Sequence, residues 1–169
     1  MKTMNFKFVN QPTGNSCGPT CLYMVLDYIL NKRNSFNPVG GQHALPLEVE
    51  IKFSVQDICD MCGTDWIVGT PPDKMIKGMK ALNIKYTEYI CSPRPYDLLR
   101  NVIDSENIPI LRTITKDVPH WIIINSYEKN IFNILDPWLG EIQYSEKDLD
   151  DIWKVRNYQF FEILVNGNN

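Results

Sequence analysis

The sequence has no long apolar run and no excess of basic residues. No window approaches the roughly 20 apolar residues that a membrane span requires, and the N-terminal segment lacks the apolar stretch of a signal peptide. The formal net charge of −3 offers no basic field for a nucleic acid or an anionic membrane. The sequence therefore predicts neither a membrane protein nor a nucleic-acid-binding protein.

Cysteine and histidine are both scarce. The five cysteines are an odd number, so a complete disulfide framework would leave one of them unpaired. Reduced thiols in a cytoplasmic protein are the simpler interpretation, with secretion as the alternative if a signal peptide has been removed. The chain holds two histidines, His43 and His120. His43 lies in a loop segment rich in glycine and proline, so His120 is the stronger candidate for chemistry.

The composition suits one globular domain over residues 1–169, since 44% of the residues are hydrophobic and 22% are charged. We find no internal repeat, linker or low-complexity tract. Helical periodicity dominates the first half and strand patterns dominate the second half, which predicts an α+β fold with an antiparallel sheet. Helices are expected over 19–30, 54–63, 71–83 and 96–103, and strands over 6–8, 84–90, 108–112, 120–125, 131–136, 142–144 and 158–165.

The segment around Cys17 has the features of a nucleophile at the start of a helix. Turn-forming residues lead into the step Cys17-Gly18-Pro19, and an apolar helical pattern follows. Pro19 suits the first helical turn, where its missing N–H costs nothing. The unpaired N–H groups and the macrodipole at a helix N-terminus favour a thiolate. The alternative is that Cys17 is an ordinary buried cysteine in a loop that enters a helix.

A predicted hairpin tests whether Cys17 has a base. With a turn centred on Glu128, position 120 pairs with 136, 122 with 134 and 124 with 132. His120 and Asp136 then lie directly opposite each other on one face, with Cβ atoms about 4.5–5.5 Å apart. A register shift of one residue would separate them. If the register holds, the chain has the base and the orienting group that an activated cysteine needs.

Two further groups have competing interpretations. The side-chain amide of Gln11, six residues before Cys17, could donate to a developing oxyanion together with the Cys17 N–H, or Gln11 could be a plain polar loop residue. Cys59 and Cys62 have the spacing of half a zinc site. No second pair completes the site, so we expect both to pack in the core.

The motifs together resemble the bacteriocin-processing family of papain-like cysteine peptidases, which cut leader peptides after a double glycine, often at the front of an export transporter. The resemblance covers most of the chain and is carried by Gln11 and three segments: Ser16–Val25, His120–Ile124 and Asp136–Gly140. It implies a papain-like α+β fold, with the nucleophile helix packed on a C-terminal antiparallel sheet. It also implies that Cys17 is the nucleophile, His120 the general base, Asp136 its orienting group and Gln11 the oxyanion donor.

This chain is expected to be a stand-alone, bacterial "like" member of that family. Members of this kind have diverse substrates, so double-glycine cleavage is not implied. The segment 31–53 is longer than the resemblance leads us to expect and is expected to reshape the substrate groove.

The resemblance implies a cysteine peptidase that cuts a peptide or protein substrate through a thioester acyl-enzyme, with no metal or cofactor. The same residues would also serve a deamidase, a transglutaminase-like enzyme or an acyltransferase. A peptide-binding module without turnover is less favoured, because such a module would be expected to lack Cys17. A secreted effector that acts on a host protein is a further alternative. The substrate preference and the oligomeric state do not follow from the sequence.

Overall fold

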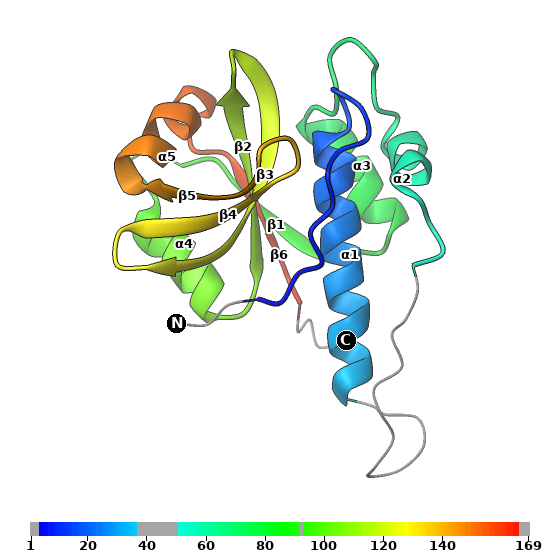
Figure 1. Ribbon diagram of the computed structural model, residues 1–169, viewed down its shortest axis with the longest axis horizontal. Helices are drawn as coiled ribbons and strands as arrows, with labels where there is room; N and C mark the ends of the chain where they lie inside the picture. Colours follow the sequence, from blue (N-terminus) through cyan, green and yellow to red (C-terminus); the bar gives the residue numbers. More distant parts are fainter. Residues whose placement is uncertain (1–3, 37–50, 92, 166–169) are drawn as a thin grey trace.

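The computed structural model describes residues 4–36, 51–91 and 93–165. A helical part comes first in the chain, followed by a sheet with further helices (Figure 1). The helices are α1 (Cys17–Phe36), α2 (Val55–Cys62), α3 (Pro72–Ala81), α4 (Tyr96–Asp104), α5 (Glu146–Trp153) and the short 3₁₀ helix η1 (Lys154–Arg156). The strands are β1 (Tyr86–Tyr89), β2 (Ile108–Thr115), β3 (Val118–Glu128), β4 (Ile131–Asp136), β5 (Gly140–Ser145) and β6 (Phe160–Ile163).

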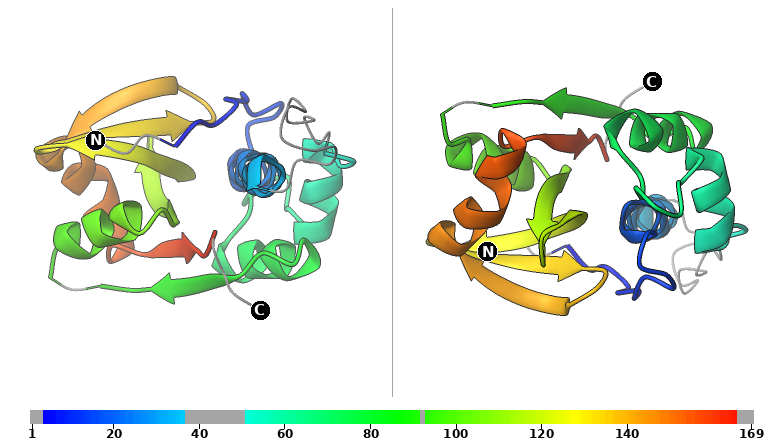
Figure 2. Two further views of the ribbon diagram at one scale, coloured as in Figure 1. Left: turned by 90° about the horizontal axis from the view of Figure 1, so that it is seen from below. Right: turned by 90° about the horizontal axis from the view of Figure 1, so that it is seen from above.

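The six strands form one antiparallel sheet in the order β1-β6-β2-β3-β4-β5. Helix α1 runs along one face of the sheet, with α3 beside it and α2 on its far side, and α4 and α5 cover the other face (Figure 2). This arrangement confirms the predicted α+β fold in which the nucleophile helix packs on an antiparallel sheet.

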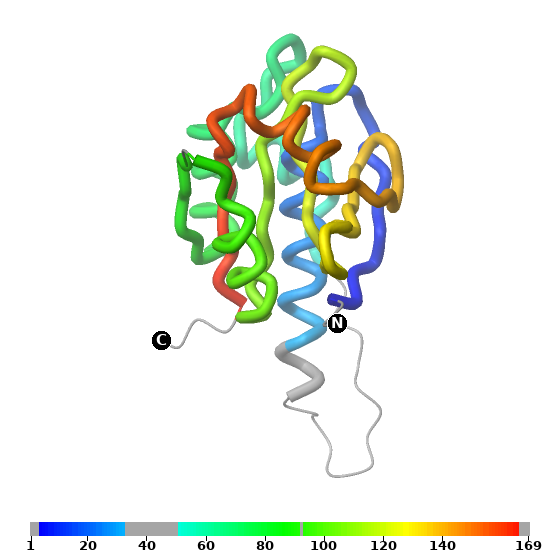
Figure 3. Tube along the Cα trace, turned by 90° about the vertical axis from the view of Figure 1, so that its left-hand side faces the viewer, coloured from blue at the N-terminus to red at the C-terminus, as the bar shows by residue number. Residues whose placement is uncertain are grey.

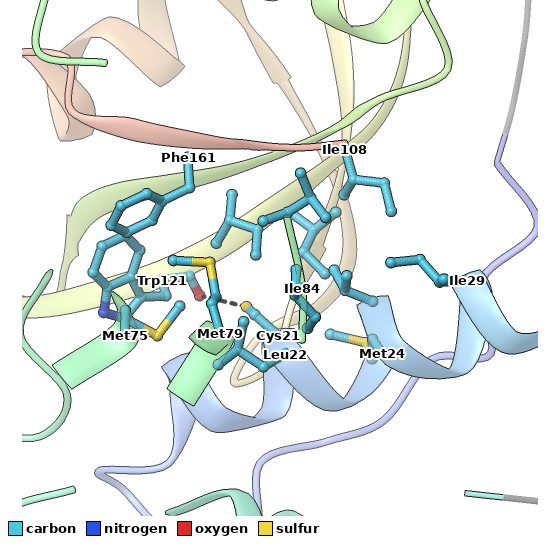
Figure 4. Packing of buried hydrophobic residues seen from close by; sticks show 14 of the residues in the cluster. Cys21, Leu22, Met24, Ile29, Met75, Met79, Ile84, Ile108, Trp121 and Phe161 are labelled. Carbon is cyan, nitrogen blue, oxygen red and sulfur yellow. Dashed lines mark hydrogen bonds between the residues drawn. The ribbon is translucent and has the colours of Figure 1, made fainter. Parts of the chain in front are cut away.

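Two apolar layers hold the sheet between these helices. Alternate side chains of β3 point to opposite faces, so Trp121 and Ile123 join the layer toward α1, whereas Ile122 and Ile124 join the layer toward α4 and α5. Figure 4 shows the first layer, where Cys21 and Leu22 of α1 meet side chains from α3, β3 and β6. Full burial of such side chains is worth about 1.5–3 kcal/mol each.

Helix α2 begins and ends at the expected local signals. Ser54 and Asp57 form a capping box, and Gly63 ends the helix in the left-handed region at φ 70°. Cys59 and Cys62 are 3% and 0% exposed, so the expected core packing is confirmed.

Three expectations about individual elements were wrong. Helix α1 continues past residue 30 to Phe36, because the segment contains no glycine or proline and basic residues suit a helix C-terminus. Residues 6–8 pair with no strand of the described sheet; Phe6 instead stacks on Tyr28 of α1, with ring centroids 4.7 Å apart. Helix α5 was not expected, although Ser145 and Asp148 supply a capping box.

Other predictions fall outside the described part of the chain. Most of the loop expected over 35–46, including His43, and most of the long segment 31–53 lie there, whereas residues 35 and 36 belong to α1. Within the described residues, no helix combines the length and the apolar character that crossing a membrane requires.

The β3–β4 hairpin differs from its predicted register. Its turn is Lys129-Asn130, so the predicted turn centre at Glu128 was wrong: Glu128 pairs with Ile131, and Ser126 and Tyr127 also belong to the ladder. A bulge at Asn125 then shifts the pairing by one residue, and Ile124 lies opposite Ile134 instead of position 132.

The bulge decides whether His120 and Asp136 lie on the same face of the sheet. Continuing the pairing unchanged from the turn would put Asp136 opposite Ile123 and would turn His120 to the other face of the sheet. After the shift, Asp136 falls opposite Ile122, so His120 is its diagonal neighbour on the same face. Directly opposite pairing of His120 and Asp136 was therefore wrong, but the shared face is present.

Candidate active site

Cys17 is the first residue of α1 and is 5% exposed. Ser16 precedes it, and its carbonyl accepts the first helical bond from the Thr20 N–H at 2.9 Å. Pro19 lies in the first turn, as predicted. The thiol of Cys17 therefore lies at the positive end of a 20-residue helix, where N–H groups have no helical carbonyl to bond.

Gly18 allows this helix start to approach the sheet. A Cβ at position 18 would lie 2.6 Å from the Met75 sulfur and 3.1 Å from Cδ1 of Trp121. The Trp121 indole N–H donates to the Thr70 carbonyl at 2.7 Å, which ties the loop before α3 to strand β3. The role of Thr70 could not be predicted from the sequence, because only the folded chain brings residues 18, 70 and 121 together.

His120 and Asp136 form a buried pair. Nε2 of His120 lies 2.7 Å from Oδ1 of Asp136, and each side chain is 2% exposed. The same carboxylate oxygen accepts the backbone N–H groups of Trp138 at 2.8 Å and Leu139 at 3.0 Å. These two bonds hold the Asp136 carboxylate in one orientation, and the carboxylate in turn orients the His120 imidazole ring.

Cys17 lies close enough to raise the pKa of His120, through hydrogen bonding and through charge. Because Asp136 engages Nε2, Nδ1 is the ring nitrogen left for the thiol. The order thiol, imidazole, carboxylate is the one that an activated cysteine nucleophile requires.

The charges of the pair support each other. Burial alone lowers the pKa of His120, but the hydrogen bonds to Asp136 and Cys17 outweigh burial and raise the pKa from 6.5 to about 9. For Asp136, burial raises the pKa, but the hydrogen bond from His120, its positive charge and the two backbone N–H groups lower it below 3.8 overall. A cationic imidazole beside an ionised carboxylate is therefore the favoured state at neutral pH.

Gln11 lies in the loop that leads to Cys17 and is held next to the segment after Asp136. Its backbone N–H donates to the Pro137 carbonyl at 2.8 Å. Its side-chain nitrogen donates to the Thr13 carbonyl at 2.8 Å, and an amide nitrogen carries a second hydrogen. Its Oε1 is buried and has no hydrogen-bond partner in the described part of the chain.

Three aromatic residues near the site have different positions. Trp121 is 3% exposed and belongs to the core, whereas Trp138 is 42% exposed and sets its ring edge-on to His120, with centroids 6.0 Å apart. Tyr144 is half-buried in β5. The ammonium group of Lys116 lies 4.6 Å from the Trp138 ring centroid, a contact the sequence did not indicate.

The side chains that bind metals do not gather around the site. Among the described residues, no group of three or more histidine, cysteine, aspartate or glutamate side chains is arranged to hold a metal ion. The five cysteines are free thiols.

The α+β fold, with Cys17 at the start of α1 and His120 and Asp136 on the sheet, is that of the papain-like cysteine peptidases. The chain belongs to the Peptidase_C39 like family, whose model matches residues 3–161. A comparison with curated protein sequences gave no significant match.

Solved structures that are similar in fold include peptidases and peptidase domains. The chain is similar to the peptidase domain of Streptococcus ComA, a bifunctional ABC transporter involved in quorum sensing, with 15% identity, TM-score 0.65 and coverage of 94% of this chain and 98% of that one. It is similar to a double glycine motif protease from an AMS/PCAT transporter in complex with the leader peptide, with 14% identity, TM-score 0.66 and coverage of 96% and 94%. A Bacillus anthracis chain assigned to the C39-like peptidases has 12% identity, TM-score 0.66 and coverage of 97% and 98%.

Proposed function

We propose that this chain is a cysteine peptidase that cuts a peptide or protein substrate, with Cys17 as the nucleophile. The observation that carries the proposal is the buried hydrogen bond of 2.7 Å between His120 and Asp136, together with the rise in the pKa of His120 that Cys17 causes. Membership of the Peptidase_C39 like family supports it. The leader peptide bound to the AMS/PCAT protease supports a peptide as the class of substrate.

The proposed reaction forms and then hydrolyses a thioester. The Cys17 sulfur attacks the scissile carbonyl carbon, and the carbonyl oxygen becomes an oxyanion. The protonated His120 gives its proton to the leaving amine as the C–N bond breaks. Water then attacks the thioester, His120 takes a proton from it, and the thiolate leaves.

Gln11 and the start of α1 are proposed to stabilise the oxyanion. One side-chain N–H of Gln11 remains after the bond to Thr13, and the Cys17 N–H lies at the helix N-terminus. The backbone bond between Gln11 and Pro137 holds this loop against the turn that fixes Asp136. Two fixed donors that face a developing negative charge are a large source of rate enhancement.

Asp136 is proposed to orient His120 and to hold its charge, as its lowered pKa and its three hydrogen bonds favour. We also propose that residues 1–169 form one domain and that the enzyme acts in the cytoplasm. The reaction as written uses water as the only co-substrate.

The test is the rate of Cys17 alkylation by iodoacetamide against pH, followed by intact mass, for the wild type and His120→Ala. We expect a wild-type rate that stays high well below pH 8.5, about the value of an ordinary thiol, and a large loss in the variant. A rate that follows an ordinary thiol in both proteins would contradict the proposal.

A second measurement separates hydrolysis from related chemistry. A peptide mixture is incubated with wild type or Cys17→Ala, and the products are identified by mass spectrometry. New chain ends that depend on Cys17 support a peptidase. A gain of about one mass unit at glutamine indicates a deamidase, a peptide joined to an added amine indicates a transferase, and retention without change indicates a binding module.

A further inference from the structure

Exposed apolar side chains gather around the candidate site. In the described part of the chain, ten large apolar residues are exposed, and six of them lie at the end of the molecule where α1 begins. We call these six residues the apolar rim: Trp66, Ile67, Val68, Val118, Trp138 and Leu139. Figures 1 and 3 show the loops that carry them at that same end.

The helical side of the rim is the turn Trp66–Val68 between α2 and α3. The side-chain amide of Asn15, two residues before Cys17, donates to the Trp66 carbonyl. Gly69 follows the turn, and a Cβ at that position would lie 3.7 Å from the Asn15 carbonyl oxygen. The turn is therefore attached to the same loop that leads into the nucleophile helix.

The sheet side of the rim adjoins His120. Val118 lies two residues before His120 on β3. The Trp138 ring centroid lies 6.0 Å from that of His120, and the Leu139 N–H donates to Asp136. The two sides of the rim thus contact the loop before Cys17 and the His120–Asp136 pair, respectively.

The turn Trp66–Val68 is held in a defined shape. The Asp65 carboxylate accepts the N–H groups of Ile67 at 2.7 Å and Val68 at 2.9 Å. Asp65 and Gly69 exchange two backbone hydrogen bonds of 2.9 and 2.8 Å, and Gly69 has a φ of +79°. Ile67 is 91% exposed on this braced backbone. A preorganised surface of this kind loses little conformational entropy when it binds a ligand.

We propose that the turn Trp66–Val68 determines specificity by binding an apolar side chain of the peptide substrate, with Trp138 contacting the peptide from the sheet side. The inference rests on the proposed function. One side of the rim contacts the loop before Cys17 and the other contacts the His120–Asp136 pair, so a peptide whose carbonyl reaches Cys17 is the occupant that the position of the rim favours. A charged substrate side chain placed against the turn would lose water without gaining a partner from Ile67 or Val68.

The experiment compares two irreversible probes of equal length that end in a glycine chloromethyl ketone. One carries leucine, valine and phenylalanine before the glycine, and the other carries serine, asparagine and glutamine. In both, the Cys17 sulfur displaces chloride and forms a thioether. The rate of each is divided by the rate with iodoacetamide, which is too small to contact the rim.

We expect the wild type to react at least about tenfold faster with the apolar probe, because one buried apolar side chain is worth that much or more. In Ile67→Ser/Val68→Ser the preference falls to within about threefold of unity, and the iodoacetamide rate is unchanged. The matched control is Ile90→Ser, because Ile90 is 67% exposed and follows β1 at the far edge of the sheet. The control keeps the wild-type preference.

Equal rates for the two probes in the wild type, or an unchanged preference in the double variant, would overturn the inference and leave the proposed peptidase intact. A wild type that dimerises through the rim, and becomes monomeric in the double variant by light scattering, would also overturn it, since a second copy would then be the occupant. The proposed function fails separately, if Cys17 reacts with iodoacetamide as an ordinary thiol irrespective of His120.

Discussion

His120 and Asp136 make their 2.7 Å hydrogen bond as diagonal neighbours across β3 and β4, and the extra residue Asn125 turns both side chains to one face. A strand pair without the bulge would leave His120 on the opposite face from Asp136. The single bulged residue Asn125 thus determines whether the His120 imidazole has a carboxylate as its hydrogen-bond partner.

Replacing the carboxylate by an amide should separate its charge from its shape. In Asp136→Asn the amide oxygen can still accept from the Trp138 and Leu139 N–H groups, but the side chain brings no charge to His120. The pKa of His120 should then fall from about 9 toward 6.5. Because a less basic imidazole stabilises the thiolate less, we expect the Cys17 alkylation rate in Asp136→Asn to rise at a higher pH than in the wild type. Peptide cleavage should fall by less than the roughly 10²–10⁴-fold that loss of a general acid–base costs.

Asp136→Ala is the companion variant. It removes the acceptor as well as the charge, and it leaves the part-buried N–H groups of Trp138 and Leu139 without their partner. We expect it to be destabilised by about 1–3 kcal/mol more than Asp136→Asn in urea unfolding. Equal alkylation profiles for wild type and Asp136→Asn would show that the carboxylate charge does not act on the site.

The stability of the fold should depend on pH through the same pair. The folded pKa of His120, about 9, exceeds its ordinary value of 6.5. Its contribution is therefore complete below pH 6.5 and is lost as the pH rises through 9. Asp136 has a lowered pKa, so its contribution is present above its ordinary pKa and is lost as the pH falls through the folded value.

We therefore expect the pair to stabilise the protein most between about pH 4 and 6.5. The free energy of unfolding should drop by on the order of 2–3 kcal/mol between pH 6 and 9.5. Urea unfolding followed by circular dichroism at pH 6, 7.5 and 9.5 measures this drop. The matched variant His120→Gln lacks the titrating group, and a drop of the same size in that variant would assign the effect to other groups.

Removing the Gln11 side chain should affect the two reactions of Cys17 differently. Acyl transfer develops an oxyanion, and loss of one donor to it costs roughly 10²–10³-fold in kcat. Alkylation by iodoacetamide develops no oxyanion, so its rate in Gln11→Ala should match the wild type. A parallel loss in both reactions would instead indicate that Gln11 holds the loop before Cys17 in place through its bond to Thr13.

The elements that the sequence predicted well are those with local signals. Ser54, Asp57 and Gly63 determine the ends of α2 through contacts within a few residues. The position of Cys17 at a helix start likewise followed from Pro19 and the apolar spacing after it. Both the fold class and the family resemblance rest on patterns of this kind.

The features that the sequence did not predict depend on distant partners. The sequence around Asn125 contains no local signal for a bulge, because the bulge depends on how the whole of β3 pairs with β4. Helix α5 is an exception, because its capping box and the spacing of Leu149, Ile152 and Trp153 are local signals from which it could have been predicted. The approach of the turn Trp66–Val68 to Asn15 joins positions about fifty residues apart, as the separation of 51 shows.

The tight contact at Gly18 provides the last prediction. A methyl group in Gly18→Ala would meet the Met75 sulfur at 2.6 Å, Cδ1 of Trp121 at 3.1 Å and Cβ of Thr70 at 3.2 Å. Trp121 and Thr70 cannot give way easily, because they are hydrogen-bonded to each other at 2.7 Å. We expect a loss of about 1–3 kcal/mol in urea unfolding, together with a displaced Cys17 and a weaker dependence of its alkylation on His120.

Gly78→Ala is the matched control for overpacking away from the site. Its methyl group would clash with the Cys62 sulfur and lie 3.1 Å from Leu22, between α3 and its neighbours α2 and α1. This variant should also lose stability, but it should keep the wild-type pH profile of Cys17 alkylation. If both glycine variants lose stability and both keep that profile, the close approach at Gly18 serves packing alone. A changed profile in Gly18→Ala only would mean that the same contact positions the thiol against the imidazole.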